Sequence, residues 1–116
     1  VESHTAHAAP ITATLEAAQL ATGYITSTSA AAVSLTLPTA TLLAAEIGAV
    51  AGTSFEFIVD NTAGANTVTI LVGAGITAAT PVITGGATLT VSVANAIGIF
   101  RIVFSSATVA KLYRIG

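Results

Sequence analysis

Two runs of alternating apolar and polar side chains lie close together in the middle of the chain. The first, SFEFIVD at residues 54–60, and the second, TVTILV at residues 67–72, show the two-residue period of a β-strand with two different faces. Residues 61–66, which separate them, read NTAGAN, and Asn and Gly favour tight turns. The stretch from Ser54 to Val72 therefore predicts an antiparallel hairpin around which the rest of the chain is organised.

Shorter runs with strand periodicity continue on both sides of this stretch. They predict a mainly β, single-domain antiparallel β-sandwich or barrel over residues 11–116, preceded by an extended N-terminal arm over residues 1–10. The last two runs should form a hairpin in which Phe100, Ile102 and Phe104 share one face. Strands are expected at Ile11–Thr14, Tyr24–Thr28, Val33–Leu37, Ile76–Thr80, Thr88–Val93, Ile99–Ser105 and Val109–Ile115.

Two short helices are expected between the strands. Thr14 can cap the first, Leu15–Leu20, because its hydroxyl can accept a backbone N–H of the first turn, and Gly23 can end it. Thr39 can cap a second helix that runs to about Ile47. The apolar face of this second helix is expected to contain Leu42, Leu43 and Ile47.

The charge content is very low for a chain that is expected to form a globular domain. Charged residues make up 7% of the 116 residues, against roughly 25% in ordinary soluble domains. Hydrophobic residues make up 53%, and the mean hydropathy is +0.90. Since charge normally keeps protein surfaces apart, we expect Thr and Ser to cover part of the outside and another subunit to cover much of the rest.

Composition also argues against several classes of function. The longest apolar stretch, Leu42–Ala51, contains Glu46 and is about half the length that spans a bilayer, so no membrane association is expected. Three basic residues and a net charge of −2 argue against binding to nucleic acid. The absence of cysteine excludes disulfides and thiolate metal sites.

The first ten residues, Val1–Pro10, are polar and alanine-rich and have no hydrophobic period. Glu2, His4 and His7 can be considered as metal ligands, but an extended arm lacks a preformed geometry, so no metal site is predicted. The arm is instead expected to be ordered only by contact with a partner. The residues expected to contact that partner are Val1, Glu2, His4, His7, Pro10 and Ile11.

Two carboxylates, Glu56 and Asp60, share one face of the first central strand. Such a pair can serve acid–base catalysis or calcium binding. The favoured interpretation is a charged outer face, paired with Arg101, Lys111 or Arg114 on neighbouring strands. Both histidines lie in the arm, far from any serine nucleophile in a strand, and no glycine-rich phosphate loop is present. We therefore expect no enzyme activity and no cofactor.

Threonines two residues apart recur along the chain, as at Thr26/Thr28, Thr67/Thr69 and Thr88/Thr90. Regular threonine rows on a flat sheet can order water in ice-binding proteins. The spacing between these pairs is not constant, so they would not stack into one lattice. The favoured interpretation is that threonine fits a pleated strand and replaces charge on the polar face.

Three segments resemble small Ala/Thr-rich virion proteins of tailed bacteriophages. These are ITATLEAAQLATGYITSTSAAAVSLTLPTAT near the start, GTSFEFIVDNTAGANTVTI in the centre and FRIVFSSATVAKLYRIG at the end. Such sequences recur as free-standing virion proteins and as modules of fibre-like proteins. The resemblance covers nearly the whole chain. It implies a structural role in the virion and supplies no catalytic residues.

We therefore expect a non-enzymatic capsid decoration (cement) protein on the capsid surface of a phage. It is expected to form a homotrimer on the major capsid protein, with residues 1–11 reaching onto the shell or an adjacent subunit. One alternative is a tail-fibre or spike module that binds a host surface glycan. Another is a subunit of an extracellular filament, although the arm has few of the large apolar residues that a donated strand needs.

Overall fold

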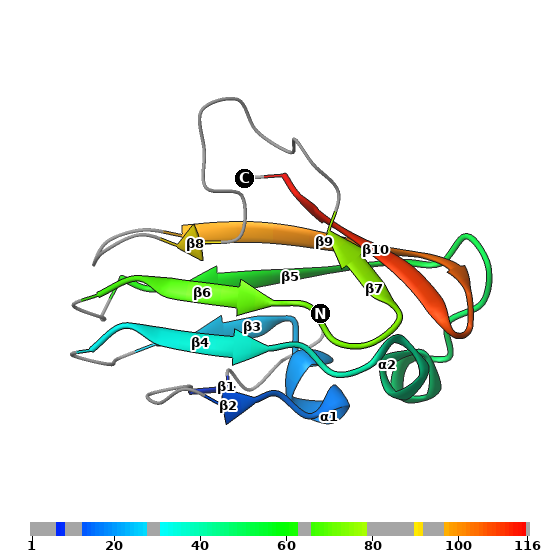
Figure 1. Cartoon of the computed structure of the whole chain (residues 1–116), viewed down its shortest axis with the longest axis horizontal. Coiled ribbons are helices and arrows are strands. Elements are labelled where there is room, and N and C mark those ends of the chain that lie inside the picture. The colour runs from blue at the N-terminus through cyan, green and yellow to red at the C-terminus, as the bar shows by residue number, and fades with distance from the viewer. Residues whose placement is uncertain are drawn as a thin grey trace, which may run out of the picture.

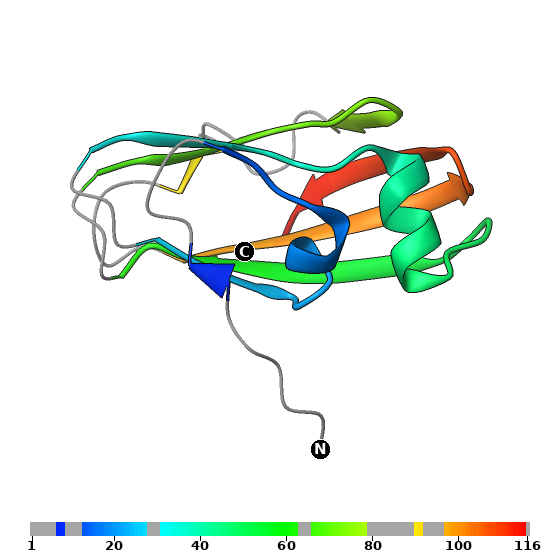
Figure 2. The ribbon, with the colours of Figure 1, turned by 90° about the horizontal axis from the view of Figure 1, so that it is seen from below.

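The computed structural model describes residues 7–8, 13–27, 31–62, 66–78, 90–91 and 97–115, and all structural statements below concern these residues. Two β-sheets pack face to face, with two short helices beside them (Figure 1). Seen side on, the sheets form two layers and the helices lie between them (Figure 2). The prediction of a mainly β sandwich with one or two short helices is confirmed.

The two layers contain six and four described strands. The six-stranded sheet has the order β1 (His7–Ala8), β3 (Tyr24–Thr26), β5 (Ser54–Asp60), β9 (Ile97–Ser106), β10 (Val109–Arg114) and β7 (Ile76–Ala78). The four-stranded sheet has the order β2 (Ala13–Thr14), β4 (Val33–Thr36), β6 (Val68–Leu71) and β8 (Thr90–Val91).

Successive strands from β1 to β6 alternate between the two sheets. As a result, β1, β3 and β5 run parallel in one sheet, and β2, β4 and β6 run parallel in the other. Five of the eight described strand pairings are parallel, so the sandwich is mixed where antiparallel pairing was expected. This winding places strands that are distant in sequence beside each other, as Ile25 of β3 is beside Val59 of β5.

The predicted central hairpin is wrong, because β5 and β6 belong to different sheets. Each strand does have one apolar face, but the two faces meet across the core and the strands do not pair by hydrogen bonds. Phe57 and Val59 of β5 enter the core from the six-stranded sheet, and Val68 and Ile70 of β6 enter it from the four-stranded sheet. A strand in a hairpin and a strand in a sandwich show the same alternation, so the local pattern could not distinguish them.

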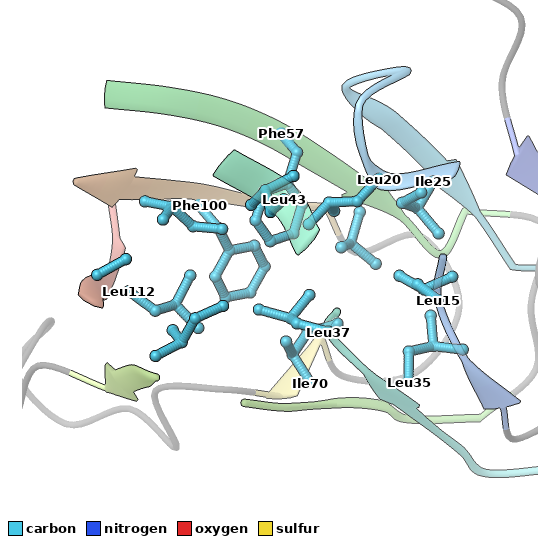
Figure 3. Packing of buried hydrophobic residues seen from close by; sticks show 14 of the residues in the cluster. Leu15, Leu20, Ile25, Leu35, Leu37, Leu43, Phe57, Ile70, Phe100 and Leu112 are labelled. Atoms are coloured by element: carbon cyan, nitrogen blue, oxygen red, sulfur yellow. The ribbon is translucent and has the colours of Figure 1, made fainter. Parts of the chain in front are cut away.

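The last hairpin forms as predicted. Strands β9 and β10 pair antiparallel, with Phe104 opposite Ala110 and Ile102 opposite Leu112. Phe100, Ile102 and Phe104 are all buried. The ring of Phe100 lies 5.3 Å from that of Phe57, its cross-strand neighbour on β5. Figure 3 shows side chains from both sheets and both helices pointing toward one another around these rings.

Helix α1 (Ala17–Leu20) starts later than predicted. Thr14 ends strand β2, and Glu16 occupies the N-cap position. The backbone N–H of Glu16 donates to Oε1 of Gln19 at 2.8 Å, which is half of a capping box. Gly23 lies just beyond the helix with φ of 76°, a left-handed conformation that glycine adopts without strain.

Helix α2 (Ala40–Ile47) begins where it was predicted to begin. The Oγ1 atom of Thr39 accepts the backbone N–H of Leu42 at 3.2 Å. The helix buries Leu43 against the core, but Leu42 is 58% exposed. The prediction that Leu42 belongs to the buried face is therefore wrong, and Ala44 takes that place.

Part of the predicted arm belongs to the fold itself. His7 and Ala8 form β1, which pairs with Ile25 and Thr26 of β3 at the edge of the six-stranded sheet. The expectation that the arm is ordered only by a partner is wrong for these two residues. The other residues predicted to contact a partner lie outside the described residues, and they are Val1, Glu2, His4, Pro10 and Ile11.

Candidate functional site

The outer faces of the two sheets differ in chemistry. On the four-stranded sheet the outward positions are mostly hydroxyl-bearing, and Ser34, Thr69 and Thr90 form one row across three strands. In the next row Thr14 pairs with Thr36, and Thr36 with the exposed Leu71. Hydroxyl groups therefore replace charge on this face, as the composition predicted.

The outward face of the six-stranded sheet instead has a row of large apolar side chains. Tyr24 is paired with Ile58, and Ile58 with Ile99. The row continues to Ile115, whose N–H donates to the carbonyl oxygen of Ile99 at 2.9 Å. We call Tyr24, Ile58, Ile99 and Ile115 the apolar row. Ile58 and Ile115 remain 38% and 48% exposed, so the described chain covers them only in part.

More exposed apolar residues lie on the same face, around this row. Ile97 is 50% exposed, near the start of β9, and Val109 is 49% exposed, at the start of β10. A sheet packed on only one side normally places polar residues on its other side. An outward face with this much exposed apolar surface is typical of a contact with another molecule.

A single ion pair lies beside the apolar row. Glu56 and Arg101 occupy neighbouring positions on β5 and β9, and Arg101 Nη2 lies 3.1 Å from Glu56 Oε2. Of the three cations expected to pair with these carboxylates, Arg101 does so, with Glu56. Both side chains are about half exposed, so water screens the attraction and the pair contributes at most about 1 kcal/mol to folding.

The other two predicted cations do not pair with these carboxylates. Arg114 donates to the backbone oxygen of Thr90, and its guanidinium carbon lies 5.4 Å from the centre of the Phe100 ring. Partial burial there lowers the pKa of Arg114 from its usual value. Lys111 is exposed on the outer face of β10.

The carboxylate of Asp60 accepts three hydrogen bonds from neighbouring residues. Its carboxylate accepts Thr62 Oγ1 at 2.6 Å, Thr62 N at 2.9 Å and the Tyr24 hydroxyl at 2.7 Å. The bonds from Thr62, and then the bond from Tyr24, lower the pKa of Asp60. The same hydrogen bond to Asp60 raises the pKa of Tyr24.

The geometry gives no support to a shared ion between Glu56 and Asp60. Residues four apart on a strand are separated by about 13 Å, far more than one calcium ion can bridge. Within the described part of the chain, no three His, Asp or Glu side chains gather where they could hold a metal.

The apolar row was missed in the sequence, although a signal for it was present. Ile58 lies between Glu56 and Asp60 and shares their outward face. Ile99 lies two residues before Arg101 and therefore shares its face of the strand. Isoleucine at a position that alternation assigns to solvent indicates a face that something else covers. Ile115 and Tyr24 join the row only through strand pairing.

Comparison with models of protein families, with curated proteins and with solved structures finds no match to this chain. None of the helices in the described ranges has the length and apolar content needed to cross a membrane.

Proposed function

We propose that this chain is a structural subunit that acts by assembly, and that it is a capsid decoration (cement) protein of a tailed bacteriophage. It forms a symmetric oligomer, a trimer, and binds the major capsid protein at the capsid surface. The observation that favours assembly is the contrast between the two outer faces. One has mostly hydroxyl groups, with Leu71 as an exposed apolar exception, and the other has the apolar row, in which Tyr24, Ile58 and Ile115 are exposed.

The outward face of the six-stranded sheet is large enough for a contact somewhat below the standard size. Its six strands, spaced about 4.8 Å apart and rising about 3.3 Å per residue, present a face of roughly 500 Å², of which the apolar row is one part. Standard protein interfaces bury about 800 Å² on each partner. Burial of apolar surface stabilises a contact by about 25 cal/mol per Å², before the cost of association is subtracted.

The resemblance of three segments to phage virion proteins supports the more specific assignment. A cement protein binds the assembled shell and not its separate subunits, so it stabilises the assembled state by mass action. Such a role requires exposed contact surfaces and no reaction chemistry. A domain with 7% charged residues and one apolar outer face meets that requirement.

The oligomer is tested by light scattering on the purified chain, which we expect to give the mass of a trimer. The double substitution Ile58→Thr and Ile99→Thr places hydroxyl groups in the middle of the apolar row and should release monomers. Leu71→Thr makes the same kind of change on the opposite sheet, where Leu71 is 45% exposed, and should leave the trimer intact. A wild-type monomer at every concentration would contradict the proposal.

Binding to the head is tested separately with empty heads assembled from the major capsid protein of the same phage. The wild-type chain should co-sediment with the heads and raise the temperature at which they open. A trimer that remains in the supernatant would leave assembly intact but would refute the decoration role.

A further inference from the structure

A groove of about 870 Å³ lies between the two helices and the adjoining end of the four-stranded sheet. Its walls are mostly apolar, with Leu15 and Leu37 from the core side and the exposed Leu42 from α2. The facing helix positions are small, and Ala17 and Ala45 are among them, so side chains do not fill the space between the helices. The exposure of Leu42 follows from this open groove.

Two carboxylates line this apolar groove, Glu16 at the start of α1 and Glu46 near the end of α2. Among the described residues, neither makes an ion pair, since the one ion pair found there is Glu56–Arg101. The groove is therefore apolar and negatively charged, and the described residues that line it include no Lys or Arg. Its natural occupant is an apolar surface that presents a single positive charge.

One surface of the chain itself has this chemistry. Of the three Lys and Arg residues in the sequence, Arg101 is paired with Glu56, and Arg114 contacts Thr90 and Phe100. Lys111 makes no ion pair within the described part of the chain and is exposed on β10. It lies beside a hollow of about 330 Å³. That hollow is also lined by Val103, Val109 and Tyr113.

We infer that the groove of one copy binds the β9–β10 surface around Lys111 of a second copy. The methylene stem of Lys111 lies along the apolar wall, and its ammonium group reaches Glu16 and Glu46. This inference rests on the proposed function and names the subunit contact within the oligomer. The two contacting surfaces are different, so the contact is head-to-tail. Repeated head-to-tail contacts close into a ring such as a trimer, or continue as a filament if the rotation does not close.

The placement of Lys111 agrees with the apolar row. Lys111 is paired with Val103 of β9 on the outward face of the six-stranded sheet, the face that also presents Ile58 and Ile99. A neighbour that covers Lys111 with its groove also covers exposed apolar surface on that face. One contact therefore fills the space between the helices and covers the part of the sheet face where Val103 and Val109 lie beside Lys111.

The test is a charge exchange between the two surfaces, read as the oligomer dissociation constant by light scattering or analytical ultracentrifugation. Lys111→Glu and Glu46→Lys should each raise that constant by at least about tenfold, because each places like charges together. The variant with both substitutions should return toward the wild-type value. Thr69→Lys adds a charge on the four-stranded sheet, outside the groove, and should have no effect. All three substituted positions are partly or fully exposed, so circular dichroism should show the native fold in every variant.

The outcomes separate this inference from the proposal on which it rests. If the wild-type chain is oligomeric and neither single charge reversal weakens it, the groove contact is refuted and the assembly proposal stands. Weakening by both single reversals without recovery in the double variant also refutes the contact between residues 46 and 111. A wild-type chain that is monomeric throughout refutes both.

Discussion

At the scale of single residues, Asp60 should make the stability of the fold depend on pH. Its folded pKa is lowered, mainly by the hydrogen bonds from Thr62 and then by that from Tyr24. A lowered pKa means that the ionised carboxylate stabilises the fold above the pKa of the unfolded chain. This contribution is lost as the pH falls through the lower, folded pKa.

Asp60→Asn keeps an acceptor for Tyr24 but removes the charge. We expect a loss of stability at neutral pH of below about 1 kcal/mol, because the site is close to solvent. The difference from wild type should disappear in acid, where the wild-type carboxylate is also neutral. Urea unfolding across the pH range measures this, and a difference that persists unchanged in acid would show that the charge is not the cause.

Asn61, the next residue, joins the two sheets from a fully buried position. Its Nδ2 group donates to the backbone oxygen of Asn66, at 2.6 Å, where the chain approaches β6. Asn61→Ala removes the donor to the backbone oxygen of Asn66. It should lower the free energy of unfolding, measured with urea, by about 1–3 kcal/mol. Asn66→Ala retains the backbone acceptor and serves as the comparison, which we expect to cost less than Asn61→Ala.

At the scale of elements, the start of α2 depends on its cap. Thr39→Ala removes the oxygen that accepts the N–H of Leu42 and should lower the free energy of unfolding by about 1 kcal/mol. Thr41→Ala is the matched control inside the same helix, where Thr41 is exposed and alanine is the better helix former. A loss of stability in the control that equals the loss in Thr39→Ala would contradict a specific capping role.

The elements also show how far the sequence determines the fold. The capping threonine, the C-terminal hairpin and its buried faces follow from local patterns, and they were predicted correctly. Partners of β5 and β6 did not follow, because alternation fixes which face of a strand is buried and not which strand lies beside it. Glu16, not Thr14, occupies the N-cap of α1, because Thr14 pairs with Thr36 in a sheet. This is a long-range contact, which local propensity does not indicate.

The candidate surfaces were predictable to different degrees. The sequence indicated that Glu56 lies on a charged outer face and offered Arg101 as one of three partners, and the strand pairing selects Arg101. The groove could not be predicted, because it exists only where α1 and α2 come together, at residues 17–20 and 40–47. The exposure of Leu42 could not be predicted for the same reason. Helical periodicity indicates which side of α2 is apolar, but whether another element packs against that side depends on the position of α1.

At the scale of the whole molecule, neighbouring residues on β5 should respond in opposite ways. Phe57 is 1% exposed, stacks on Phe100 in the core, and its change to alanine should cost about 3–5 kcal/mol. Ile58→Thr changes the outward face and should leave the fold of the separate chain intact, as judged by circular dichroism. If both variants unfold alike, the outward face would be part of the core of the separate chain, and the assembly proposal would lose its main support.

The position of β9 affects how the chain can be made. This strand, near the C-terminus, lies between β5 and β10 in the six-stranded sheet, whereas its partner β5 ends at Asp60. During synthesis, the edge of β5 that later binds β9 is complete long before residues 97–106 leave the ribosome. A chain that stops before Ile97 would present that edge, with its unpaired N–H and C=O groups, to other nascent chains. Residues 97–106 therefore cover a strand edge that would otherwise be open to pairing with other chains.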